Sequence, residues 1–131
     1  MQFLAHLGWV VLGGGIGSGL RFGVGRVALV AFGPSYPAGT LIVNVLGCVV
    51  MGVLAEWLAF RDTGIDVSMK LFLTTGFLGG FTTFSAFALD AAALWERGEA
   101  LSATVYVLAS VVLSIGGLFA GMALTRAAFA A

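Results

Sequence analysis

Apolar residues fill four long runs of this chain, and short polar segments separate the runs. The runs cover about residues 3–32, 38–60, 68–95 and 100–123. A helix of roughly 20 apolar residues crosses the hydrocarbon core of a bilayer, so each run is long enough to be a membrane span. The separating segments hold the turn-forming and charged residues: Gly33-Pro34-Ser35-Tyr36-Pro37, Arg61-Asp62-Thr63-Gly64-Ile65-Asp66 and Glu96-Arg97-Gly98-Glu99. We predict an all-α membrane protein, with residues 1–131 forming a single domain of four transmembrane helices.

Composition agrees with this pattern and narrows the function. Hydrophobic residues make up 60% of the chain and charged residues 9%, whereas soluble domains carry about 25% charged residues. We therefore expect a multi-pass protein of the cell inner (plasma) membrane, with the lipid bilayer as a partner. A formal net charge of zero argues against nucleic acid as a partner. No nucleophile–base pair and no cluster of metal-ligating side chains is visible, so we do not expect an enzyme.

The third run differs from the others in its chemistry. Its middle reads Gly76-Phe77-Leu78-Gly79-Gly80-Phe81-Thr82-Thr83-Phe84-Ser85-Ala86-Phe87. Non-helical backbone at membrane depth is tolerated where it is buried in protein or lines a cavity. We predict that the third helix is interrupted near its centre, and that the interruption marks a binding or permeation site.

The basic residues show almost no preference for one side of the membrane. With four spans, Arg61, Lys70 and Arg126 fall on the side of the N-terminus, and Arg26 and Arg97 fall on the other side, with Arg21 further inside the first span. Cytoplasmic loops normally carry an excess of Lys and Arg. A chain without this bias can insert both ways, and pairing of the two orientations predicts an antiparallel, dual-topology homodimer.

Glycines at small-xxx-small spacing occur in three of the runs, as Gly13/Gly17, Gly76/Gly80 and Gly117/Gly121. Such pairs let membrane helices approach closely, and we interpret them as packing surfaces rather than ligand sites. Four closely packed helices fill their own interior. A permeation pathway is therefore more plausible between protomers than inside one.

Hydroxyl and amide side chains are spaced along two of the runs. Tyr106, Ser110 and Ser114 recur every four residues on one helix face, as do Thr40 and Asn44. The hydroxyl stripe could donate hydrogen bonds to a moving anion, or each hydroxyl could bond to its own helix or to a neighbouring helix. The Asn44 amide must be satisfied by another helix, by water or by a permeant species.

Phe84 and Phe87 are three residues apart, so their rings share a helix face. The edge of an aromatic ring is electropositive, and rings presented edge-on can stabilise a small dehydrated anion without a fixed cation. Plain core packing is the alternative. Arg21 lies nearest to membrane depth among the cations, where it either snorkels to the surface or collects anions at a wet pore mouth.

These residues together resemble the Fluc (CrcB) family of fluoride channels over essentially the whole chain. The third-run motif Gly76-Phe77-x-Gly79-Gly80-x-Thr82-Thr83-Phe84-Ser85-x-Phe87 is the most specific part. The other matching pieces are Gly13-Gly14-x-x-Gly17 to Arg21, Pro37-x-Gly39-Thr40-Leu41-x-Val43-Asn44, and the Tyr106/Ser110/Ser114 stripe.

The resemblance implies an antiparallel dimer with two parallel pores that export fluoride passively and selectively from the cytoplasm. It also implies that the break in the third helix binds a structural sodium ion at the dimer centre, through the backbone carbonyls of Gly79 and Thr82 from both subunits. The chain departs from the usual motif at Ala86 and Ala88, where hydroxyls are common, and at Asp90, where Glu is common. The fluoride-pore residues implied are Phe84, Phe87, Asn44, Tyr106, Ser110, Ser114, Ser85, Thr40 and Arg21.

Two other classes remain as alternatives. A proton-coupled small multidrug-type exporter is also a four-span dual-topology dimer, but it needs a carboxylate in its substrate cavity, usually on the first span. The first span here contains no acidic residue. A non-transporting assembly subunit would use its polar residues only to hold helices together.

Overall fold

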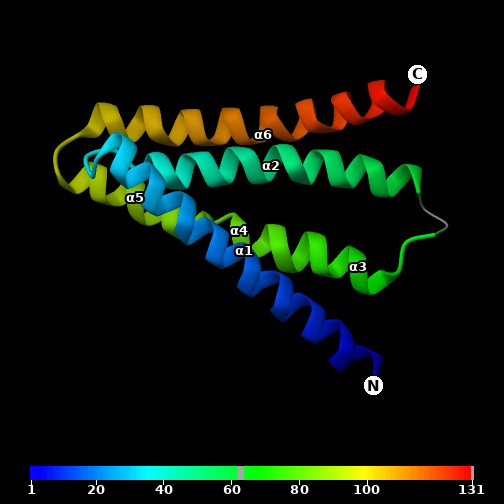
Figure 1. Cartoon of the computed structure of the whole chain (residues 1–131). Coiled ribbons are helices and arrows are strands. Elements are labelled where there is room, and N and C mark those ends of the chain that lie inside the picture. The colour runs from blue at the N-terminus through cyan, green and yellow to red at the C-terminus, as the bar shows by residue number, and fades with distance from the viewer. Residues whose placement is uncertain (62–63, 131) are drawn as a thin grey trace.

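The computed structural model describes residues 1–61 and 64–130, and within them it contains four helical spans and no strand (Figure 1). Each span is long and apolar enough to cross a membrane, which confirms the predicted all-α class. Residues 62 and 63 of the predicted polar loop lie outside the described residues. The elements are α1 (Gln2–Phe32), α2 (Ala38–Phe60), α3 (Val67–Leu71), the π-helix η1 (Phe72–Leu78), α4 (Gly79–Phe81), α5 (Phe84–Glu96) and α6 (Ala100–Ala130).

Each of the four spans runs antiparallel to the one before it, so both termini lie at one end of the molecule (Figure 1). The α1–α2 and α5–α6 turns lie at the opposite end. Each of these turns contains a glycine in the left-handed region, Gly33 with φ 77° and Gly98 with φ 78°. Glycine adopts this conformation without the steric penalty that a Cβ atom would bring, so it ends the preceding helix and reverses the chain.

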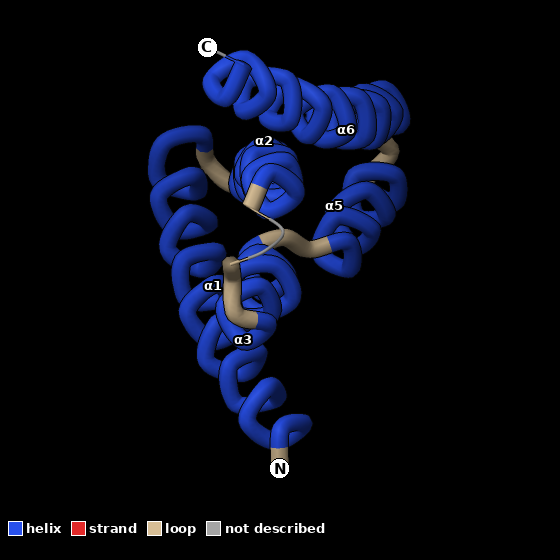
Figure 2. The backbone as a smooth tube through the Cα atoms, turned by 90° about the vertical axis from the view of Figure 1, so that its right-hand side faces the viewer, coloured by secondary structure: helices blue, strands red, loops and turns tan. Residues whose placement is uncertain are grey.

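Helix α2 is the central element of the fold. It packs along α6 and also contacts α1, η1, α4 and α5, and Figure 2 shows it flanked by α1 and α5 with α6 alongside. A polar residue on α2 can therefore reach the middle of the third span. Asn44 occupies this position.

Helix α6 continues to Ala130, beyond the end predicted near residue 123. Two contacts hold its last turns against the end of α2. Arg126 forms an ion pair with Glu56, with Nε 2.8 Å from Oε1, and Phe129 stacks on Phe60 with ring centroids 5.2 Å apart. The extra turns are therefore fixed by partners on α2.

Close helix packing at glycines is confirmed where α1 crosses the third span. A Cβ atom at Gly17 would collide with the backbone carbonyl of Phe77, and one at Gly80 would collide with that of Gly14. The same relation joins α6 to α2, where a Cβ atom at Gly121 would collide with the carbonyl of Val49. Backbone-to-backbone approach of this kind is how membrane helices associate without a hydrophobic driving force.

Many large apolar side chains remain on the outer surface of the chain. Phe22 is 72% exposed and Val30 is 83% exposed. The largest fully buried side chains among the described residues are Tyr106, Leu78, Leu94 and Val43. Soluble monomers rarely expose large contiguous apolar areas. This surface suits contact with lipid or with further protein, as expected of a membrane protein.

Candidate functional site

The backbone in the middle of the third span departs from helical geometry. Helix α4 ends at Phe81 and α5 begins at Phe84, while Thr82 (φ −85°, ψ 159°) and Thr83 (φ −154°, ψ 120°) are extended between them. The preceding turns form the π-helix η1, which the sequence pattern did not predict. Single π-helical turns often occur at functional sites.

Asn44 satisfies the backbone that this departure leaves unpaired. Its Nδ2 donates to the carbonyl oxygen of Thr83 at 2.9 Å, and its Oδ1 accepts from the Thr83 N–H at 2.7 Å. Of the three partners that the sequence left open for the Asn44 amide, the structure provides another helical span. One Nδ2 hydrogen is used in this pairing, and an amide nitrogen carries two, so a second donor remains.

The hydrogen bonds of two nearby N–H groups are also redirected. In a continuous helix the N–H of Thr83 would donate to the carbonyl of Gly79, and that of Ala86 to the carbonyl of Thr82. Here the Thr83 N–H donates to Asn44, and the Ala86 N–H donates to the Thr83 hydroxyl at 3.2 Å. The carbonyls of Gly79 and Thr82 therefore lose their usual helical partners.

A groove of about 400 Å³ lies next to this segment, between α2, α5 and α6. It brings together five of the residues predicted for a pore: Asn44, Phe84, Phe87, Ser110 and Ser114. The other residues that line it are Cys48, Thr82, Thr83, Val111 and Ile115. The groove is mostly apolar, with a few amide and hydroxyl groups along its wall.

The two phenylalanine rings of the groove lie in different environments. Their centroids are 5.4 Å apart with planes tilted by 55°. Phe87 is buried and packs against the ring of Tyr106 at 5.5 Å, whereas Phe84 is 79% exposed. Core packing therefore accounts for Phe87 in this chain but not for Phe84, which projects from the surface.

Ser110 has no hydrogen-bond partner among the described residues, although its Oγ is buried. Other hydroxyls in the spans bond to their own helix: Thr104 donates to the carbonyl of Ala100, and Thr125 to that of Gly121. A buried polar group without a partner costs about 1–3 kcal/mol. Because Ser110 lines the groove, this unpaired hydroxyl can serve a species within it.

The remaining predicted residues lie outside this groove. Tyr106 is fully buried, and its hydroxyl donates to Asp90 Oδ2 at 3.3 Å. Ser85 is exposed, and its Oγ is 3.3 Å from the Thr83 hydroxyl. Arg21 and Thr40 line a second cavity of about 310 Å³ between α1, α2 and the third span.

Thr83 and Cys48 are site residues that the sequence analysis did not single out. Thr83 pairs with Asn44 and caps α5 by accepting from the Ala86 N–H. A threonine whose side-chain oxygen accepts from the N–H three residues later is a common N-cap, so Thr83 could have been found as the start of a helix. Cys48 lies one turn beyond Asn44 on α2, and this spacing could have placed it on the same face.

Comparison with known proteins identifies the family. The model of the family described as CrcB-like protein, Camphor Resistance (CrcB), matches residues 8–122. A Rhizobium etli protein named fluoride-specific ion channel FluC is 57% identical over 118 residues, which cover 90% of this chain and 94% of that protein. A protein of the same name from Paracoccus denitrificans is 52% identical over 121 residues, which cover 92% of this chain and 94% of that protein. Another from Agrobacterium fabrum is 47% identical over 126 residues, which cover 96% of this chain and all of that protein (100%).

These relatives are named as ion channels and not as enzymes, in agreement with the prediction from the sequence. Their bacterial origin and the four apolar helices fit a multi-pass protein of the bacterial inner membrane. The matched segment extends over all four spans and includes Asn44, Phe84, Phe87, Ser110 and Ser114. The chain therefore belongs to the CrcB family.

Proposed function

We propose that this protein is a passive, selective fluoride channel that exports fluoride from the cytoplasm. The observation that carries the proposal is the groove in which the unpaired Ser110 hydroxyl lies with Asn44, Phe84 and Phe87. The relatives named as fluoride-specific ion channels support the choice of ion. The wall of the groove suits a small anion that has lost most of its water.

Each kind of group on the wall contributes a donor without a formal charge. Serine hydroxyls and the second Nδ2 hydrogen of Asn44 donate hydrogen bonds, and the phenylalanine ring edges are electropositive. A full positive charge could hold the anion too firmly, because conduction requires binding that is weak enough for release. Tyr106 and Thr40 continue the polar path beyond Phe87, and Arg21 attracts anions from the second cavity.

We further propose that two chains pair as an antiparallel homodimer and form two pores. The 79% exposure of Phe84 and the exposure of Gly79 leave the groove and the central backbone open on one side. A second copy in the opposite orientation would cover both. The nearly even distribution of Lys and Arg supports insertion in both orientations.

A structural sodium ion at the dimer centre fits the backbone of the third span. The carbonyls of Gly79 and Thr82 lack their usual helical partners because Asn44 and the Thr83 hydroxyl take the two N–H groups involved. Carbonyl oxygens are the ligands that hard cations prefer. When bound, the ion would supply positive charge to four such carbonyls, two from each chain, and Gly79 and Thr82 would hold it.

Fluoride efflux from liposomes that contain the purified protein tests the proposed channel. We expect rapid release of fluoride but not of chloride, unaffected by a pH gradient, because no step requires a proton. Release that depends on a proton gradient, or transport of organic cations, would favour the small multidrug-type exporter. A folded protein that transports neither fluoride nor organic cations would leave only the assembly subunit.

Locking the orientation tests the antiparallel dimer separately. Two lysines added to the α5–α6 turn should force that turn to the cytoplasmic side. We expect the locked chain to be inactive alone, and to regain activity when it is expressed with a chain locked the other way by two lysines next to Arg61. Full activity of either locked chain alone would contradict dual topology.

A further inference from the structure

A third cavity lies at the end of the molecule that carries the α1–α2 and α5–α6 turns. Its volume is about 280 Å³, and Thr40 and Asp90 are among the side chains that line it. Among the described residues that line it, Arg97 carries the only positive charge. The carboxylate of Asp90 would repel an anion inside this cavity, so a nearby cation has a direct electrostatic effect there.

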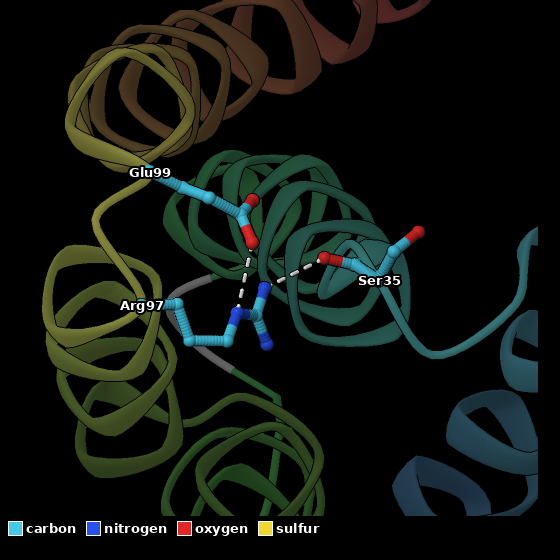
Figure 3. Close-up of polar contacts among 3 residues, drawn as sticks. All are labelled: Ser35, Arg97 and Glu99. Carbon is cyan, nitrogen blue, oxygen red and sulfur yellow. Dashed lines mark hydrogen bonds and ion pairs between the residues drawn. The ribbon is translucent and has the colours of Figure 1, made fainter.

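Contacts from both turns hold the Arg97 side chain in place (Figure 3). Its Nη2 donates to the carbonyl oxygen of Ser35 at 2.9 Å, and its Nε forms an ion pair with Glu99 Oε1 at 2.9 Å. The side chains of Arg97 and Glu99 remain 46% and 43% exposed. The guanidinium group is therefore fixed at the outer edge of the cavity, where water and ions can reach it.

Tyr106 connects the lining of this cavity with the groove that contains Phe84 and Phe87. Asp90 accepts a hydrogen bond from the Tyr106 hydroxyl at 3.3 Å, and the Tyr106 ring lies 5.5 Å from that of Phe87. Phe87 in turn lines the groove. Asp90, Tyr106 and Phe87 therefore form a chain of contacts that leads from the cavity to the groove.

We propose that Arg97 concentrates anions at this mouth, and that Glu99 weakens the effect by pairing with it. The inference rests on the proposed fluoride-channel function and adds an entrance whose charge sets the rate of ion capture. The fixed guanidinium offsets the negative charge of Asp90. Glu99 does not line the cavity. Its negative charge, paired with Arg97, reduces the attraction of Arg97 for anions from outside the cavity.

Fluoride efflux from liposomes at two ionic strengths tests this role, with Arg97→Gln, Glu99→Gln and the matched control Arg26→Gln. Arg26 lies near the same end of the molecule as Arg97, but on the outer face of α1 with Val27 and Val30. Its replacement removes one positive charge, as Arg97→Gln does, without changing a residue that lines the cavity. A unit charge about 8 Å away in water changes the local anion concentration about two- to threefold. The salt is potassium glutamate, with valinomycin to carry the compensating charge.

At about 10 mM salt we expect Arg97→Gln to lower the initial efflux rate about two- to threefold, Glu99→Gln to raise it, and Arg26→Gln to leave it unchanged. At about 1 M salt the screening length falls from about 30 Å to about 3 Å, and the differences should nearly vanish. Arg97→Lys, which keeps the charge but loses the fork of donors, should retain most of the wild-type rate at low salt.

Three results would overturn the inference while leaving the channel intact. They are an Arg97→Gln rate equal to that of Arg26→Gln, a loss that persists unchanged at 1 M salt, or an Arg97→Lys rate as low as that of Arg97→Gln. The last two would assign Arg97 a purely structural role in joining the turns. Wild-type protein that releases no fluoride would instead overturn the proposed function itself.

Discussion

Replacing Asn44 by alanine removes the side chain that pairs with the extended backbone of the third span. Two hydrogen bonds are lost, the one from Nδ2 to the Thr83 carbonyl at 2.9 Å and the one from the Thr83 N–H to Oδ1 at 2.7 Å. Leaving a buried backbone group unpaired costs about 1–3 kcal/mol. With two groups affected, Asn44→Ala should destabilise the fold by about 2–6 kcal/mol, towards the lower value because water can enter the adjoining groove.

The free energy of unfolding can be measured by titrating detergent-solubilised protein with SDS while following tryptophan fluorescence. Cys48→Ala is the matched control, because Cys48 lies one turn further along α2 and lines the same groove. Its thiol makes no hydrogen bond within the described part of the chain, so the control should change the stability by less than about 1 kcal/mol. Fluoride efflux should fall to background for Asn44→Ala, because the donors of the groove are no longer held in place.

Asn44→Asp sharpens the argument because its outcome depends on pH. An ionised aspartate can still accept from the Thr83 N–H, but it sets an oxygen against the Thr83 carbonyl where Nδ2 now donates. A protonated aspartic acid can both donate and accept. Stability should therefore rise as the pH is lowered and the carboxyl is protonated. Wild-type stability of Asn44→Ala, or a pH-independent Asn44→Asp, would refute the role assigned to this amide.

Three further predictions concern the groove and the helix contacts. Phe84→Ile and Phe87→Ile keep bulk and hydrophobicity but remove the electropositive ring edge, so fluoride efflux should fall at least tenfold (about 1.4 kcal/mol in the barrier); unchanged efflux would mean that the rings only pack. Ser110→Ala should leave the free energy of unfolding equal or slightly higher, because the Ser110 hydroxyl has no partner among the described residues, but it should lower fluoride efflux. A loss of stability would show that the hydroxyl has an internal partner. Gly17→Ala should prevent stable folding because its Cβ would meet the Phe77 carbonyl, whereas Gly15→Ala, which has open space, should fold normally in size-exclusion chromatography.

The arrangement of the spans was predictable because length and hydropathy alone determine it. Turns at Gly33 and Gly98 and apolar runs of membrane-spanning length leave few alternatives to four antiparallel helices. The end of α6 was not predictable in this way. The Arg126–Glu56 ion pair that fixes its last turns joins residues far apart in sequence, and no pattern within the last run indicates it.

The sequence predicted a set of pore residues but not the contacts between them. The spacing of Ser110 and Ser114 predicted a shared helix face, and in the structure both line the groove together with Asn44 and Phe84. Spacing could not show that Arg21 lies in a separate cavity, because that depends on how α1 crosses the third span. The crossing is set by backbone contacts at glycines, which hydropathy does not register.

Ala86 affects the site in two ways, through its side chain and through its backbone N–H. Its side chain lines the cavity of Arg21 rather than the groove, so the absence of a hydroxyl at this position takes no donor from the groove wall. Its backbone N–H donates to the Thr83 hydroxyl and thereby frees the carbonyl of Thr82. A serine or threonine at position 86 would retain that N–H and add a hydroxyl near Arg21. We therefore expect Ala86→Ser to change anion capture at Arg21 more than passage between the phenylalanine rings, so the efflux rate should rise at low fluoride concentration and stay unchanged at saturating fluoride, whereas an equal change at both would contradict this assignment.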